Sequence, residues 1–182
     1  MKAYFSVFSF FFTLASAEDM IKCGTPSAGP VLNGLDLVET LKSLAYGNAP
    51  VFANSTEHSY VDEDGFVFQF ASEENKETYL ANVDLYQIGA GGYCGFAVSG
   101  FDPACGSDGD SCNGPACLTS DETAEILVND GKMYFFLGNG ALNQFMKTDG
   151  SRENAADNLE EARKSSGYAN CYNTDLFRCK GE

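Results

Sequence analysis

The sequence predicts an α+β fold: a small antiparallel sheet of hairpins with short helices, a disulfide-stapled loop and a C-terminal tail. Two pairs of segments alternate apolar and polar side chains around turns that end in Asp-Gly, a pattern typical of β-hairpins. Other segments carry apolar side chains at helical spacing and end near a glycine. The seven cysteines indicate that disulfide bonds order the loop and the tail.

Length and composition indicate one globular unit rather than a disordered or multidomain chain. The 182 residues are 44% hydrophobic and 13% aromatic, which is enough to build a core. Acidic residues outnumber basic ones by 26 to 11, and the net charge of −15 repels phosphate backbones and anionic lipid surfaces. We therefore expect no nucleic-acid partner.

The first residues have the pattern of a secretory signal peptide. A basic start at Lys2 is followed by apolar residues 4–14 and by the small residues 15–17, which match the A-x-A cleavage pattern. The apolar run is shorter than the ~20 residues that span a bilayer, which argues against an uncleaved anchor. We expect residues 1–17 to be removed and Glu18 to begin the mature chain. No later segment predicts a membrane span, so the product is expected to be secreted or to reside in the lumen of the secretory pathway.

The amino-terminal half predicts two helices and a hairpin. Residues 18–32 contain glycines and prolines and are expected to form an irregular lead-in. Apolar side chains at helical spacing, followed by a glycine and a proline, predict a short helix over 35–46. Alternating side chains predict strands at 58–61 and 66–70. A helix over 72–81 follows, because its first residue is a serine that can cap it and two glutamates occupy its first turn.

The carboxyl-terminal half predicts a second hairpin and two helical segments. Residues 99–120 form a Cys- and Gly-rich insertion with too few apolar side chains to order itself by burial. Strands are expected at 125–128 and 132–137. A short helical piece around 143–146 precedes a polar helix over 151–164, which ends before a glycine.

The cysteine count predicts disulfides and one leftover thiol. All seven cysteines follow the predicted signal peptide, and an exported chain normally pairs its thiols. We expect Cys171 to pair with Cys179 within the tail, residues 166–182, and two of the insertion cysteines to pair with each other or to reach Cys23. The unpaired cysteine is expected to be Cys94. The residues expected in bridges are Cys23, Cys105, Cys112, Cys117, Cys171 and Cys179.

Five short segments carry a resemblance to a known family. They are N-G-L-D at 33–36, F-V-F-Q-F-A-S-E-E-N at 66–75, L-Y at 85–86, G-G-Y-C-G-F-A-V at 91–98 and D-G-K-M-Y at 130–134. In this order they resemble the stand-alone YHS domain family, and the similarity covers roughly residues 33–165. The resemblance implies a small α+β domain of a kind associated with metal binding.

The sequence also departs from that family. The tripeptide Tyr-His-Ser that names it is absent, because Glu57 stands before His58 and Ser59. The cysteines that accompany the second strand in the metal-linked forms are missing as well, since that stretch reads F-A-S-E at 70–73. Both departures leave few of the family's metal ligands in this chain.

Candidate chemistry concentrates on Cys94. Gly91 and Gly92 let the backbone turn tightly beside it, and a helix beginning there would favour the thiolate, which is both a nucleophile and a soft-metal ligand. The expected metal ligands are Cys94, the neighbouring oxygen of Tyr93, and His58, for an ion of the copper or iron class. The alternative is that Cys94 is a buried core residue or half of a disulfide.

These observations lead to three alternative functions. The first is an exported YHS-like binding module that holds a metal ion through Cys94. The second is a thiol redox enzyme in which Cys94 attacks and an insertion cysteine resolves the intermediate. The third is a disulfide-stapled extracellular interaction protein without a ligand. No catalytic motif was found that would favour an enzyme.

One glycosylation sequon is present. Asn54, Ser55 and Thr56 match N-x-S/T before the first predicted hairpin. In an exported chain this pattern predicts a glycan on Asn54.

Overall fold

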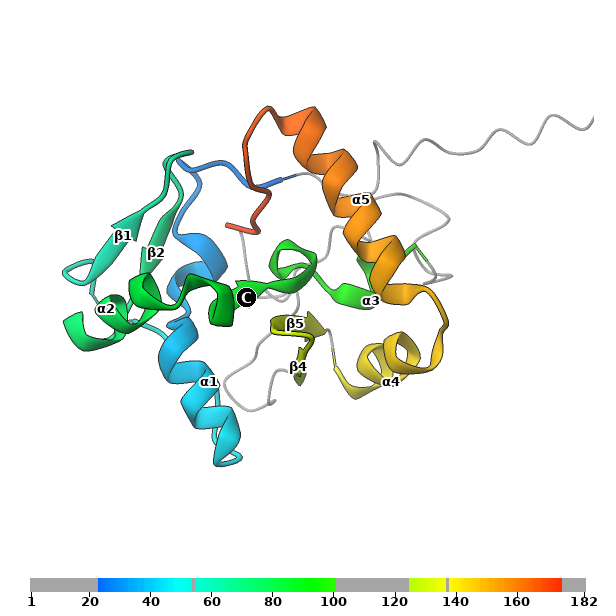
Figure 1. Ribbon diagram of the computed structural model, residues 1–182, viewed down its shortest axis with the longest axis horizontal. Coiled ribbons are helices and arrows are strands. Elements are labelled where there is room, and N and C mark those ends of the chain that lie inside the picture. The colour runs from blue at the N-terminus through cyan, green and yellow to red at the C-terminus, as the bar shows by residue number, and fades with distance from the viewer. Residues whose placement is uncertain (1–22, 54, 101–124, 137, 175–182) are drawn as a thin grey trace, which may run out of the picture.

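The computed structural model describes residues 23–53, 55–100, 125–136 and 138–174 (Figure 1). It confirms the mixed α+β class, because short helices accompany a two-stranded and a three-stranded sheet. In the described ranges, no helix is both long enough and apolar enough to cross a membrane.

Several predicted features lie outside the described residues. They include the signal peptide, most of the Cys- and Gly-rich insertion and the sequon residue Asn54. Four of the seven cysteines also lie outside the described residues: Cys105, Cys112, Cys117 and Cys179.

The first predicted helix is present but begins two residues later than expected. α1 (Leu37–Ala45) follows the N-cap residue Asp36, whose carboxylate accepts hydrogen bonds from two backbone N–H groups of the first turn. The preceding residues form the 3-10 segment η2 (Val31–Gly34). Leu35 is not helical because it makes an extended bridge to Phe52.

The first hairpin is confirmed. β1 (Ser59–Val61) and β2 (Val67–Gln69) pair antiparallel, and the turn between them closes with a hydrogen bond from the Asp62 N–H to the Phe66 carbonyl. One face of the second strand and its flanks is buried, as the alternation predicts. The buried residues on that face are Phe66, Phe68 and Phe70.

The other predicted helices are also present. α2 (Glu73–Ala81) is capped by Ser72, whose hydroxyl accepts a hydrogen bond from a backbone N–H of the first turn. α4 (Asn139–Lys147) is longer than the short piece expected around its second half. α5 (Ser151–Ser166) stops at Gly167, which adopts a left-handed conformation with φ 78°.

The second sheet is mixed rather than purely antiparallel. β4 (Glu125–Asn129) and β5 (Lys132–Phe136) form the expected hairpin. A third strand, β3 (Gln87–Ile88), pairs with β5 in parallel and gives the order β3-β5-β4. The antiparallel expectation was wrong here because a two-residue strand is too short to show an alternating pattern. The 3-10 segment η3 (Val83–Tyr86) leads the chain into β3.

The Gly-Gly segment forms a tight turn, as predicted. In η4 (Gly89–Gly92), positive φ angles occur at Ala90, Gly91 and Gly92. The four-residue helix α3 (Gly95–Val98) follows it.

β5 lies between two clusters of buried side chains. Met133 and Phe135 belong to the cluster that includes the hairpin and α1, whereas Tyr134 and Phe136 belong to the cluster of α3, α4 and α5. Both faces of the strand are therefore covered, as its alternating side chains require. Figure 1 shows β5 near the middle, with α1 and α2 on one side and α3, α4 and α5 on the other.

Candidate functional site

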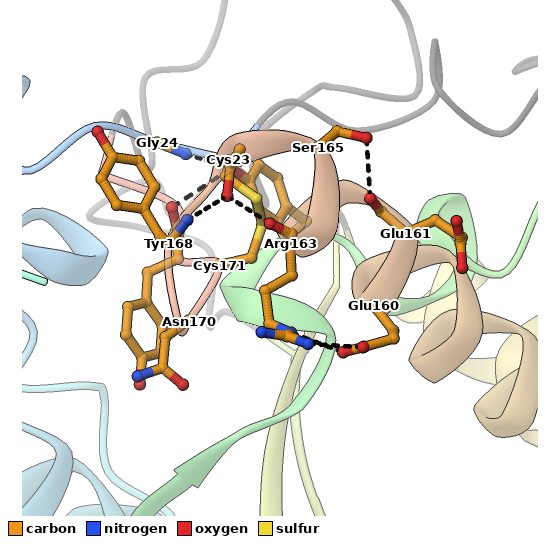
Figure 2. Close-up of a disulfide and its surroundings, with 12 residues drawn as sticks. Cys23, Gly24, Glu160, Glu161, Arg163, Ser165, Tyr168, Asn170 and Cys171 are labelled. Atoms are coloured by element: carbon orange, nitrogen blue, oxygen red, sulfur yellow. Dashed lines mark hydrogen bonds and ion pairs between the residues drawn. A yellow bond between two sulfur atoms is a disulfide. The ribbon is translucent and has the colours of Figure 1, made fainter.

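A disulfide joins the lead-in to the segment that follows α5 (Figure 2). Cys23 is bonded to Cys171, with 5.0 Å between their Cα atoms and a sequence separation of 148. The predicted pairing of Cys171 with Cys179 is therefore wrong, and Cys23 is not free to pair with an insertion cysteine. The short spacing of the two tail cysteines was misleading because the chain after α5 returns to the lead-in instead of closing on itself.

Backbone contacts hold the lead-in, the glycine turn and the tail together around this bridge. From here on, the tail means the described residues after α5, 167–174. The N–H of Gly24 donates to the Tyr172 carbonyl at 2.8 Å and to the hydroxyl of Tyr93 at 3.1 Å. The N–H of Asn173 donates to the Gly91 carbonyl at 2.8 Å. Two segments distant in sequence, the lead-in and the glycine turn, thus fix the position of the tail.

Cys94 is the free cysteine among those that the structure describes. Its side chain is buried, with 2% of its surface exposed, and it lies in the apolar cluster with residues of α3, α4 and α5. Cys94 also forms a parallel bridge with Phe135 of β5. Its position at the start of α3 agrees with the expected helix start, but that helix is only four residues long. A reactive thiol needs access that this burial does not give.

The three residues expected to bind a metal do not form one site in the described structure. His58 places Nδ1 3.1 Å from a carboxylate oxygen of Glu73, at the start of α2. Hydrogen bonds from Lys76 and from His58 hold the pKa of Glu73 below its usual value. Tyr93 uses its hydroxyl between Gly24 and the tail. Figure 1 shows β1 and α2 on the opposite side of the molecule from α3, which Cys94 precedes.

The metal site therefore lacks structural support. In the part of the chain that the structure describes, no group of three His, Cys, Asp or Glu side chains could hold an ion. A metal at Cys94 would need ligands other than His58 and Tyr93. Metal binding stays a prediction.

A cleft of about 490 Å³ is a candidate binding site. Residues of β2, α2, η3, β3, η4, β5, α5 and the tail line it, and we call it the aromatic cleft. Its aromatic lining residues are Phe68, Tyr79, Tyr86, Tyr134 and Tyr172, and its polar ones are Gln87, Lys132, Glu160, Arg163 and Asn170.

The aromatic side chains of the cleft support one another. Phe68 stacks on Tyr79 with 5.5 Å between ring centroids and meets Tyr172 edge-on at 5.3 Å. Tyr79 also contacts Tyr86, at 5.9 Å. Burial raises the pKa of Tyr79 to about 12 and raises that of Tyr172 as well. Both phenols are therefore neutral at physiological pH, and the wall they form is uncharged.

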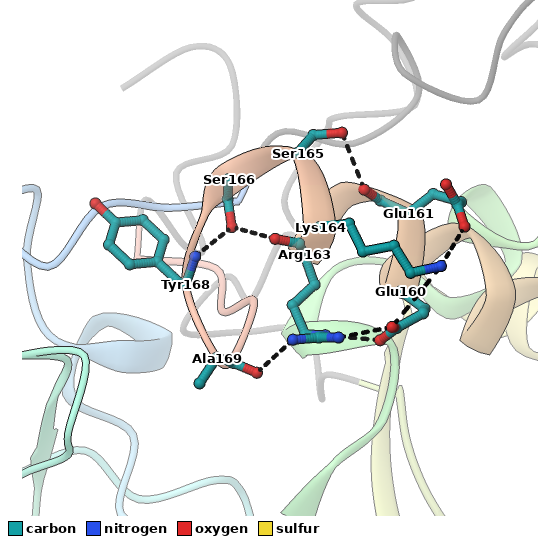
Figure 3. A network of polar contacts seen from close by, with 8 residues as sticks. All are labelled: Glu160, Glu161, Arg163, Lys164, Ser165, Ser166, Tyr168 and Ala169. Carbon is teal, nitrogen blue, oxygen red and sulfur yellow. Dashed lines mark hydrogen bonds and ion pairs between the residues drawn. The ribbon is translucent and has the colours of Figure 1, made fainter.

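The charged side chains of the cleft are not equivalent (Figure 3). Arg163 donates from Nε and Nη2 to the two carboxylate oxygens of Glu160, both at 2.6 Å, and also donates to the Ala169 carbonyl. Their hydrogen bonds lower the pKa of Glu160 and raise the pKa of Arg163. Glu160 is therefore negative and Arg163 positive, and the two charges compensate each other. Lys132 is partly buried and makes no ion pair with any described residue.

Sequence reasoning missed this cleft. Its lining residues come from segments between Phe68 and Tyr172, so only the tertiary fold brings them together. The abundance of tyrosine, nine residues in the chain, is a compositional signal but does not place any of them in a site. The disulfide matters to the cleft because Cys171 and its two neighbours form part of the wall.

No family model, no curated protein and no solved structure matches this chain.

Proposed function

We propose that this protein is an exported binding module that takes a small organic molecule in the aromatic cleft. The observation that carries the proposal is the cleft itself: about 490 Å³, lined by five aromatic side chains and a few polar ones. Ligand sites usually have this size and this combination of apolar walls and sparse polar groups.

Binding is favoured over catalysis by the residues that line the cleft. Its ionisable side chains other than tyrosine are Lys132, Glu160 and Arg163, and the last two neutralise each other. Cys171 is held in the disulfide and offers no thiol. A nucleophile hydrogen-bonded to a base, which covalent catalysis needs, is not among the lining residues.

Export is supported by one prediction from the sequence and by one structural observation. The predicted signal peptide would direct the chain into the secretory route, where disulfides form and persist. The Cys23–Cys171 bridge is the kind of bond that such a compartment maintains.

We retain the resemblance to the stand-alone YHS domain family as part of this proposal. The segments that carry the resemblance contribute residues to the aromatic cleft. Four residues of the segments that carry the resemblance also line the cleft: Phe68, Tyr86, Lys132 and Tyr134. Other residues of those segments have structural roles, such as the helix cap Asp36 and the glycine turn before Cys94. The proposed family and the proposed site therefore share residues.

The test is to fill the cleft. Ala156 lines it from α5 and is exposed, so Ala156→Phe should obstruct the cleft without disturbing the core. Asp157→Phe is the control, because Asp157 is the next exposed residue of α5 and does not line the cleft. Calorimetric titration with naphthoate and with naphthamide should detect binding to the wild type and to Asp157→Phe, and much weaker binding to Ala156→Phe. Absence of binding by the wild type to both compounds, or equal binding by both variants, would refute the proposal.

A second candidate function rests on the free thiol of Cys94. Its place beside the glycine turn is the observation that favours it. Metal analysis of the purified protein tests it: stoichiometric copper or iron that is lost in Cys94→Ser would support a soft-metal module. Metal-free protein, or equal metal content in the variant, would leave Cys94 as a core residue.

A further inference from the structure

We infer that the aromatic cleft selects an aromatic carboxylate, with Lys132 as the group that recognises its charge. This inference rests on the proposed function and names the ligand class of the same site.

The wall favours a flat ring. Four aromatic side chains from separate segments line this wall: Phe68, Tyr79, Tyr86 and Tyr172. Their rings already contact one another in stacked, edge-on and tilted arrangements. A planar aromatic ligand extends such an arrangement at little entropic cost, because the buried rings are already ordered.

The remaining charge favours an anion. Arg163 and Glu160 neutralise each other, which leaves Lys132 as the uncompensated charge among the lining residues. The chain as a whole carries a net charge of −15, so its overall electrostatic field repels anions. The positive charge of Lys132 makes the cleft a local exception, and it is complementary to the negative charge of a carboxylate.

The lysine is well placed because its backbone is fixed. Lys132 begins β5 and pairs with Gln87 of β3 on one side and Asn129 of β4 on the other. A hydrogen bond from its ammonium group to a carboxylate would be charge-assisted, and such bonds are about twice as strong as neutral ones. The aromatic rings alone would suit a quaternary ammonium ligand by cation–π attraction, but Lys132 would repel that cation.

The experiment compares three probes that share one ring system. Naphthoate is anionic, naphthamide is its neutral analogue, and naphthylmethyl trimethylammonium is cationic. We expect the wild type to bind naphthoate about tenfold more tightly than naphthamide, the difference that a charge-assisted hydrogen bond produces. The cationic probe should bind most weakly.

Variants of the lysine separate charge from shape. Lys132→Met keeps the aliphatic stem and should reduce naphthoate affinity about tenfold while leaving naphthamide affinity unchanged. Lys132→Arg keeps the charge and should retain the preference for naphthoate. The control Lys147→Met removes an exposed lysine of α4 that does not line the cleft, and it should behave as the wild type.

The outcomes distinguish the two proposals. Equal binding of naphthoate and naphthamide, no effect of Lys132→Met, or tightest binding of the cationic probe would overturn the inference while the cleft remained a binding site. Failure of both naphthoate and naphthamide to bind the wild type would refute the proposed function itself, and the inference with it.

Discussion

The side chain of Asn75 donates a hydrogen bond to the carboxylate of Asp36 across 39 residues of chain, with 2.8 Å between Nδ2 and Oδ2. The same oxygen accepts from the Ala71 N–H at 2.7 Å, and the other oxygen accepts from Val38 and Glu39 in the first turn of α1. Asp36 is fully buried. One carboxylate therefore both caps α1 and ties it to the start of α2.

Asp36→Asn tests this junction. The amide replaces one acceptor oxygen with an NH₂ donor, which would face an N–H group and leave buried donors without partners. We expect the free energy of unfolding to fall by about 2–4 kcal/mol, because two of the four hydrogen bonds to the buried side chain are lost and their donors stay buried. Urea unfolding measures the change. Asp84→Asn removes the same charge from an exposed residue of η3 and should change stability by less than about 0.5 kcal/mol.

Gly91 and Gly131 allow two causes of strain to be separated. Both have positive φ, at 63° and 76°. A Cβ at Gly91 would lie 2.5 Å from the Cys171 carbonyl oxygen, whereas a Cβ at Gly131 would meet nothing within 4 Å. We expect Gly131→Ala to cost about 1 kcal/mol for conformation alone, and Gly91→Ala to cost at least about 3 kcal/mol because the tail must also move. Equal losses in thermal or urea unfolding would show that the tail does not constrain Gly91.

Removal of the disulfide should affect both stability and the cleft. The chain-entropy relation gives about 5 kcal/mol for a loop as long as the one that Cys23 and Cys171 close, and native bridges typically contribute about 2–5 kcal/mol. We expect the double substitution Cys23→Ala with Cys171→Ala to lower the free energy of unfolding by that amount. Naphthoate binding should weaken too, because Asn170 and Tyr172 form part of the wall. Ala169→Ser, an exposed change in the tail, is the control and should leave both measurements unchanged.

The raised pKa of Tyr79 predicts that the protein loses stability at alkaline pH. Burial is the largest cause that raises its pKa to about 12, with Tyr60 and Asp62 adding to the effect. A tyrosine in the unfolded chain ionises near pH 10, so from about pH 10 to 12 the unfolded state binds fewer protons and the free energy of unfolding falls as pH rises. Below pH 10 the contribution is fully present.

Tyr79→Phe should therefore flatten the alkaline decline in stability, measured by urea unfolding at a series of pH values. The decline that remains is expected from Tyr172, whose pKa is raised mainly by its burial. Tyr46→Phe is the control, because Tyr46 is 83% exposed and its loss should leave the slope unchanged. An unchanged slope in Tyr79→Phe would contradict the assignment.

Local signals accounted for most of the elements. Ser72 before α2, the turn at Gly131 and the stop at Gly167 act within a few residues, so the sequence alone could place them. Asp36 carries a similar signal, since it is a good N-cap residue, and reading it as a cap would have begun α1 at Leu37.

Long-range contacts explain what was missed. The partner of Cys171 is set by backbone contacts such as that between Gly24 and Tyr172, which no spacing of cysteines encodes. β3 is two residues long and exists because β5 pairs with it. The aromatic cleft likewise depends on the return of the chain after α5, which brings Tyr172 against Phe68.

The bridge between Cys23 and Cys171 also determines how the protein would carry mechanical tension. A pull applied to the residues before Cys23 and after Cys171 would pass through the bond between the two sulfur atoms, and the residues between them, a sequence separation of 148, would lie outside the load path. Hairpins such as β1–β2 would otherwise unzip one hydrogen bond at a time. Under tension at its two ends the oxidised protein would keep its shape, and reduction of a single bond would transfer the whole load to the fold.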